Sequence, residues 1–234
     1  MIALTANMQA TYARIAAATA AAGRPADAVR LLAVSKTFGA DRVAEAAAAG
    51  QRAFGENYLQ EAVAKIEALR QTGPLGLALE WHFIGPLQSN KTRPVAEHFD
   101  WVHSVDRLKI AERLSAQRPD GLPPLKVLLQ VNIDDEGSKS GVTPAAAPAL
   151  AHAIAQLPRL ALRGLMTIPR PAEGFAAQRT AFAALRRLRD EITATGLALP
   201  ELSMGMSADL EAAIAEGATM VRVGTAIFGV RQAN

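Results

Sequence analysis

Short apolar runs of strand length alternate with amphipathic segments of helix length along nearly the whole chain. The strand-like runs fall at 31–36, 53–56, 81–85, 101–105, 125–132, 162–168, 201–205 and 220–224. A helical pattern follows each of the first seven, at 40–49, 58–70, 90–98, 106–117, 144–156, 174–195 and 207–216. Eight strands that alternate with helices predict an α/β fold, a closed parallel (β/α)8 TIM barrel. The doubly wound open sheet remains the alternative, because periodicity does not determine closure.

Residues 1–234 are predicted to form a single domain, since no linker rich in Pro, Gly and Ser divides them. Residues 1–26 lack acidic side chains and are rich in alanine, which superficially resembles a transit peptide. The spacing of Leu4, Met8, Tyr12 and Ile15 instead predicts an extra N-terminal helix packed on the barrel.

Composition excludes several classes of function. The chain has no cysteine, and its 4 histidines show no metal-ligand spacing, so we expect no metal site. The basic residues are scattered and aromatic residues make up only 5%, so we expect no nucleic-acid partner. No apolar run approaches the roughly 20 residues of a membrane span, so we expect no membrane contact and a cytoplasmic location.

Lys36 ends the first predicted strand, directly after five apolar or small residues. Burial disfavours a charged ammonium, and the free amine is the form that condenses with an aldehyde to give a Schiff base. The alternative is a lysine whose head group simply extends into water at the strand end.

In a TIM barrel the functional residues lie at the C-terminal ends of the strands, and closure makes the first and eighth strands neighbours. This arrangement would bring Lys36 close to Arg222 of the eighth strand. The same end would carry Asn57, Gly85, Pro86, Asn132, Ser207, Gly224 and Thr225.

The loops after the seventh and eighth strands often bind phosphate in such barrels. Ser207 is predicted to cap a helix there, where free backbone N–H groups attract anions. Gly224 permits close backbone approach and Thr225 adds a hydroxyl donor. Ordinary capping by Ser207 and a tight turn at Gly224 are the alternatives.

Arg222 shares a strand face with Gly224 and is predicted to point into the barrel end, where it needs a partner. A structural ion pair with an interior carboxylate such as Glu56 is one possibility that the sequence leaves open.

Five segments spread along nearly the whole chain carry a resemblance: AVSK at 33–36, FGENY at 54–58, WHFIGPLQSNK at 81–91, SMGMSAD at 203–209 and RVGTAIFG at 222–229. Together they resemble the pyridoxal phosphate homeostasis protein family, whose barrel resembles that of alanine racemase and ornithine decarboxylase.

The resemblance implies a role for each matching residue. Lys36 matches the lysine that forms the internal aldimine with pyridoxal 5'-phosphate (PLP), and Arg222 matches the arginine that faces the pyridine nitrogen. The other matching positions are Ser207, Gly224 and Thr225 for the phosphate, Ser203 and Met204 on the adjoining strand, and Asn57, His82 and Lys139 near the ring.

The resemblance implies a PLP-binding carrier in vitamin B6 homeostasis rather than an enzyme. Arginine offers only donors, so it leaves the pyridine nitrogen neutral and weakens carbanion chemistry. The second acid–base group of the racemases comes from a domain that the resemblance does not cover, and Tyr58 is the sole tyrosine near the expected face. A PLP-dependent amino-acid racemase and a Schiff-base aldolase for phosphorylated sugars are the alternatives. We expect a monomer, with apo PLP-dependent enzymes as possible partners.

Overall fold

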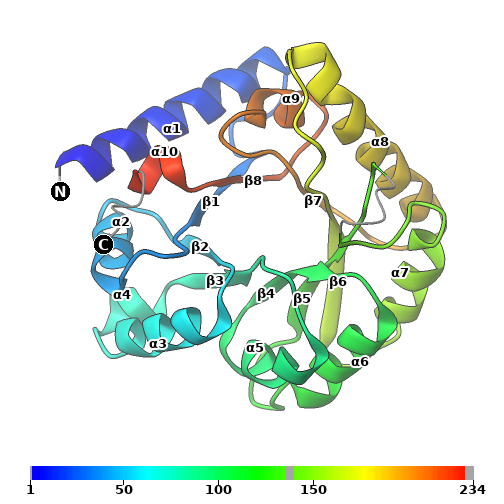
Figure 1. Ribbon diagram of the computed structural model, residues 1–234, viewed down its shortest axis with the longest axis horizontal. Helices are drawn as coiled ribbons and strands as arrows, with labels where there is room; N and C mark the ends of the chain where they lie inside the picture. Colours follow the sequence, from blue (N-terminus) through cyan, green and yellow to red (C-terminus); the bar gives the residue numbers. More distant parts are fainter. Residues whose placement is uncertain (1, 135–139, 230–234) are drawn as a thin grey trace.

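The computed structural model describes residues 2–134 and 140–229, which contain a closed barrel of parallel strands with helices around it (Figure 1). The strands pair in chain order, and β8 closes the ring onto β1 from Arg30↔Met220 to Ala33↔Val223. Closure confirms the predicted TIM barrel and excludes the open sheet. The strands are β1 (Arg30–Val34), β2 (Ala53–Glu56), β3 (Glu80–Phe83), β4 (Trp101–Val105), β5 (Leu125–Gln130), β6 (Leu160–Met166), β7 (Glu201–Ser203) and β8 (Met220–Val223).

The longer helices occupy the positions that the apolar periodicity predicts. They are α1 (Ile2–Ala21), α2 (Ala40–Ala48), α3 (Leu59–Arg70), α5 (Thr92–His98), α6 (Leu108–Gln117), α7 (Ala147–Ala155), α8 (Phe175–Ala194) and α9 (Leu210–Ala215). Three short helical turns were not predicted, because a single turn carries no periodicity: α4 (Pro74–Leu77), the 3-10 turn η1 (Ser89–Lys91) and α10 (Thr225–Phe228).

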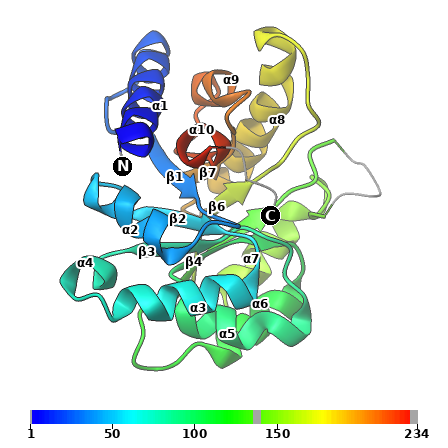
Figure 2. The same cartoon turned by 60° about the vertical axis from the view of Figure 1, so that its left-hand side comes forward.

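The predicted N-terminal helix is present as α1, which lies along α9 and α10 (Figures 1 and 2). Leu4, Met8 and Ile15 are buried as predicted, but Tyr12 is 42% exposed. Tyr12 was predicted to be buried, but a helix has 3.6 residues per turn, so the buried face that contains Met8 continues at Thr11 and Ile15 and leaves Tyr12 outside it. Thr11 is buried, but because it is polar, the apolar pattern does not assign it to that face.

The first strand ends two residues earlier than predicted, and Lys36 lies in the turn that follows it. The turn is closed by a hydrogen bond from Phe38 N to Ser35 O, 3.1 Å long, and Thr37 has a φ of 69°. A threonine in the left-handed region is uncommon and persists only where its surroundings impose it. The turn after β1 is therefore held by tertiary contacts.

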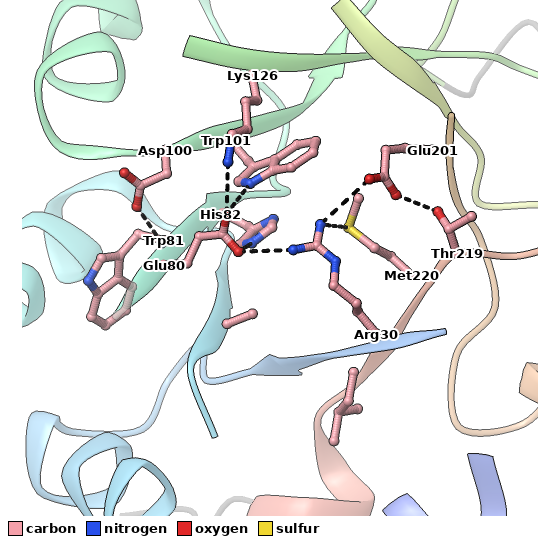
Figure 3. A network of polar contacts seen from close by, with 12 residues as sticks. Arg30, Glu80, Trp81, His82, Asp100, Trp101, Lys126, Glu201, Thr219 and Met220 are labelled. Carbon is pink, nitrogen blue, oxygen red and sulfur yellow. Dashed lines mark hydrogen bonds and ion pairs between the residues drawn. The ribbon is translucent and has the colours of Figure 1, made fainter. Parts of the chain in front are cut away.

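The interior of the barrel combines an apolar group with buried polar side chains. Trp101, Leu128, Met166 and Met220 pack together inside. An ion cluster at the N-terminal ends of the strands joins Glu80 to Arg30 and Lys126 at 3.2 Å each (Figure 3). This cluster fills the N-terminal mouth of the barrel, so a ligand site belongs at the opposite, C-terminal mouth.

Candidate functional site

Lys36 is exposed at the C-terminal mouth, in the turn after β1. The predicted burial of its head group is wrong, because the chain leaves the strand at Ser35 and turns the next residue outward. Ser35 is the buried residue of this pair. Lys36 is thus open to an aldehyde that arrives from solvent.

A buried ion pair lies directly behind this turn, and we call it the Lys65 cluster, made of Ser35, Glu56, Glu61 and Lys65. The ammonium of Lys65 lies 2.5 Å from Glu56 Oε1 and 3.1 Å from Glu61 Oε1. It also donates to Ser35 O at 2.9 Å, while Ser35 Oγ donates to Glu56 Oε1 at 2.6 Å. Glu61 Oε1 accepts from Thr37 N at 2.6 Å. The cluster therefore fixes the residues on both sides of Lys36.

Glu56 belongs to this cluster and does not pair with Arg222, so that alternative is wrong. Glu56 is fully buried, and burial raises its pKa although the charge of Lys65 opposes the shift. Glu56 follows Gly55, and successive side chains of a strand point to opposite faces. Gly55 faces Leu32 inside the barrel, which directs Glu56 outward to α3.

Arg222 is buried inside the barrel at the C-terminal end of β8. Its guanidinium donates to Ser203 O and Ser203 Oγ at 2.7 Å each, and to Thr167 O at 2.9 Å. Burial lowers the pKa of Arg222 to about 10, and the charge of Asp209 opposes that shift. Within the described ranges no carboxylate forms an ion pair with it, and two of its five N–H groups stay unused. A buried cation of this kind suits a ligand atom that accepts a hydrogen bond.

Ser203, Met204 and His82 occupy different environments. Ser203 is fully buried and contacts Arg222. The side chain of Met204 packs in the main hydrophobic core, so only its backbone is available to a ligand. His82 is also fully buried, stacked on Trp101 with ring centroids 5.4 Å apart (Figure 3). Hydrogen-bond contacts through His103 and Ser203 link it to Arg222.

The turn after β1 meets the loop after β8, as closure of the barrel requires. A Cβ atom on Gly224 would lie 3.1 Å from Val34 O, so glycine permits this close approach. The ring of Phe38 stacks on Phe228 of α10 with centroids 5.1 Å apart. Thr225 is the first residue of α10 and is exposed. The structure therefore joins Lys36 to the predicted phosphate end.

Ser207 is not the N-cap of α9, because that helix begins at Leu210 with Asp209 in the cap position. The Asp209 carboxylate accepts from Met206 N at 2.6 Å and holds the loop, so Ser207 lies half-buried in a turn. Its carbonyl accepts from Arg14 at 2.7 Å, which ties the loop to α1. The Ser207 side chain remains a predicted phosphate contact through its own hydroxyl in the loop after β7, and not through capping of α9.

Asn57 lines a cavity of about 450 Å³ at the C-terminal mouth, and its Oδ1 is buried without a hydrogen-bond partner among the described residues. Gly85 packs directly on this residue, because a Cβ there would lie 2.2 Å from Asn57 O. Tyr58 is 54% exposed, so it does not pack in a core. Lys139 lies outside the described residues. The other residues at this cavity include Ile84, Gln130, Asn132, Ile168 and Met206.

Two buried residues of the site region were missed in the sequence. Lys65 lies with Ala62, Ile66 and Leu69 on the buried face of α3. A lysine at a position where the helical period expects an apolar residue is the sequence feature that could have predicted this buried charge. His103 lies at the centre of β4, between Val102 and Ser104, and is fully buried. A histidine inside a strand-length apolar run likewise marks an interior polar contact.

The described part of the chain has no group of three or more His, Cys, Asp or Glu that could hold a metal ion. In residues 2–134 and 140–229, every helix is too short or too polar to cross a membrane.

The fold and the site define an alanine-racemase-type barrel, and residues 6–232 match the family described as alanine racemase, N-terminal domain. The alanine racemase of Corynebacterium glutamicum has a TM-score of 0.68 at 18% identity, covering 99% of this chain and 61% of that one. At this identity the likeness shows the fold alone.

Closer relatives identify the group within that class. The pyridoxal phosphate homeostasis protein of Pseudomonas aeruginosa is 62% identical over 225 residues, covering 96% of this chain and 94% of the relative. PipY of Synechococcus elongatus, solved with PLP bound, is 44% identical with a TM-score of 0.77, covering 86% of this chain and 93% of PipY. The chain belongs to the pyridoxal phosphate homeostasis protein family.

Proposed function

We propose that this chain binds PLP and acts in PLP homeostasis, carrying the cofactor as a Schiff base on Lys36 without substantial turnover. The observation that supports it most is Arg222, a buried guanidinium with unused N–H groups. A pyridine nitrogen is a neutral acceptor, which satisfies such a donor. The PLP bound to PipY and the name of the Pseudomonas relative support the same assignment.

The residues at the C-terminal mouth fit the three functional groups of PLP. Lys36 offers an amine to the aldehyde, Arg222 a donor to the ring nitrogen, and Ser207, Gly224 and Thr225 offer donors to the phosphate. The buried amide oxygen of Asn57 lacks a partner in the described part of the chain and suits a donor near the ring. When bound, PLP supplies a reactive aldehyde and an electron-withdrawing ring.

Lys36 is the residue that takes up and releases the cofactor. Its amine would hold PLP at the aldehyde carbon, and the aldehyde would supply a reversible covalent linkage that water or a second amine could release. The exposure of Lys36 supports exchange with solvent and with recipient enzymes, since a sealed site would hinder both. Apo PLP-dependent enzymes are the proposed recipients, and the carrier acts as a monomer.

Arg222 fits a carrier, although racemases also tolerate an arginine facing the pyridine nitrogen, so the turnover test below decides between the two functions. A guanidinium carries donors only and cannot serve as the acidic partner that protonates a pyridine nitrogen. Because burial lowers the pKa of Arg222 only to about 10, the group remains charged and donating at neutral pH. The ring nitrogen facing it stays neutral, which weakens the stabilisation of a carbanion.

Replacement of Lys36 by alanine is expected to abolish the visible absorption of the covalent adduct. Wild type and Lys36→Ala are mixed with PLP, freed of excess by gel filtration and compared by absorption spectroscopy. We expect a yellow absorption band, the visible sign of the covalent adduct, in wild type alone. Lys109→Ala, an exposed lysine on α6, is the matched control and should keep the band. A band of equal intensity in Lys36→Ala would refute the assignment.

The absence of turnover is tested separately with the PLP-loaded protein. Incubation with L-alanine, L-serine and other amino acids, followed by chiral chromatography, should give no more D-isomer than free PLP gives. Robust formation of a D-isomer that is lost in Lys36→Ala would overturn the carrier assignment and support the racemase alternative.

A further inference from the structure

A continuous line of polar side chains crosses the inside of the barrel from Arg222 to Glu80. Arg222 Nη1 lies 2.7 Å from Ser203 Oγ, and Ser203 Oγ lies 2.9 Å from His103 Nδ1. His103 Nε2 lies 2.9 Å from His82 Nδ1. His82 Nε2 lies 3.3 Å from Glu80 Oε2, outside regular hydrogen-bond geometry. The line joins the C-terminal mouth to the ion cluster of the N-terminal mouth, and Figure 3 shows its last two members, His82 and Glu80, within that cluster.

The two ends of this line set the direction of every hydrogen bond in it. Arginine has only donors, so Ser203 Oγ accepts from Arg222 and turns its own hydrogen to His103 Nδ1. His103 Nδ1 is then an acceptor, which places the proton of the neutral ring on Nε2, facing His82 Nδ1. His82 in turn carries its proton on Nε2, facing Glu80, which as a carboxylate is an acceptor. All the mobile protons therefore point away from Arg222.

The surroundings keep both imidazoles neutral. Complete burial is the main reason that the pKa of His103 lies well below its usual range, and the charges of Arg222 and Arg30 lower it further. Burial also lowers the pKa of His82, while Glu80 and Asp100 oppose the shift. Burial alone would raise the pKa of Glu80, but its close contact with His82, the hydrogen bond from Trp101 and the charge of Arg30 lower it well below its usual range. A negatively charged Glu80 and neutral rings at His82 and His103 agree with the direction of the hydrogen bonds deduced above.

We infer that Ser203, His103 and His82 are positioning residues that orient Arg222 as a pure hydrogen-bond donor toward the pyridine nitrogen of PLP. The inference rests on the proposed function and adds three residues that act through Arg222. Two acceptors of Ser203 and one of Thr167 take three of the five N–H groups of the guanidinium. The lone pair of Ser203 Oγ faces Arg222 only while His103 accepts the serine proton. No group along the line can pass a proton toward the ring nitrogen.

The first test uses wild-type protein labelled with 15N-histidine and needs neither PLP nor a variant. Nitrogen NMR at pH 7.5 distinguishes the two neutral tautomers and the imidazolium. We expect His103 and His82 both as neutral rings with the proton on Nε2. The assignment comes from His103→Gln, in which one of the two buried signals disappears. A protonated Nδ1 on either ring would reverse the deduced direction and overturn the inference.

The second test asks whether the line acts on the cofactor. Wild type, Ser203→Ala, His103→Leu and His103→Asn are loaded with PLP labelled with 15N in the ring. We expect Ser203→Ala and His103→Leu to shift the ring-nitrogen signal and to weaken PLP binding about five- to tenfold, the equivalent of about one hydrogen bond. His103→Asn retains an acceptor near Ser203 and should restore most of both values. His152→Leu, at an exposed histidine of α7, is the matched control.

The outcomes separate this inference from the proposed function. Wild type that takes up no PLP would refute the proposed function, while the tautomers of His103 and His82 would still decide the direction of the line. Wild type that binds PLP, with a ring-nitrogen signal and affinity unchanged in folded Ser203→Ala, would overturn the inference and leave the proposed function intact. Thermal unfolding of each variant shows which ones are folded.

Discussion

Lys65→Met is expected to lower the free energy of unfolding by about 3–5 kcal/mol, because it leaves one member of a buried ion pair without its partner. Glu56 is fully buried, and its Oε1 accepts from Lys65 and from Ser35. Methionine matches the aliphatic length of lysine, so the loss of packing is small and the loss of charge dominates. Urea unfolding followed by circular dichroism measures the change.

The same variant is expected to disturb the turn that carries Lys36, since Lys65 donates to Ser35 O at 2.9 Å. Lys109→Met, at an exposed lysine on α6, is the control and should change stability by less than about 0.5 kcal/mol. The double variant Lys65→Met with Glu56→Gln should recover part of the loss, because it removes the unpaired buried charge. A Lys65→Met protein as stable as the control would contradict the account of the Lys65 cluster.

Gly85→Ala is expected to have the second-largest effect, a loss of about 1–3 kcal/mol or more, the usual range for overpacking. The new Cβ would lie 2.2 Å from Asn57 O and 2.8 Å from Asn57 Cα, and backbone atoms cannot move aside as a flexible side chain does. Separation of the loops after β2 and β3 would also displace Asn57 from the cavity at the C-terminal mouth, so PLP binding should weaken together with stability.

Gly121→Ala is the matched control, since a Cβ at that turn meets no atom within 4 Å. Differential scanning calorimetry and a PLP titration by absorption measure the two quantities in both variants. Unchanged stability in Gly85→Ala would show that the two loops separate without cost and that the close packing on Asn57 is not required.

The barrel could be predicted from the sequence because each strand and helix has its own apolar period. The register of β8 on β1 could not, because closure is decided by the fit of all the strands together. The ends of elements were also uncertain: β1 stops at Val34 and α9 begins at Leu210, since turn contacts at Ser35 and Asp209 end the regular pattern.

The candidate site was predicted mainly through the family motifs, and its buried polar contacts were not predicted. Arg222 and Ser203 were identified, but His103 joins them from 100 positions away in the chain. Lys65 reaches Ser35 across 30 positions. Such contacts depend on which side chains meet after folding, and local periodicity contains no information on them. The exposure of Lys36 likewise depends on the turn that the Lys65 cluster fixes.

Borohydride reduction followed by peptide mass mapping tests the central claim most directly. Wild-type protein is mixed with PLP, reduced, digested and searched for the mass of a pyridoxyl phosphate group. We predict a single major labelled peptide that contains Lys36, and no label on it when reduction precedes the addition of PLP. Label mainly on another lysine, or no label at all on a protein that remains folded, would contradict Lys36 as the residue that carries the cofactor.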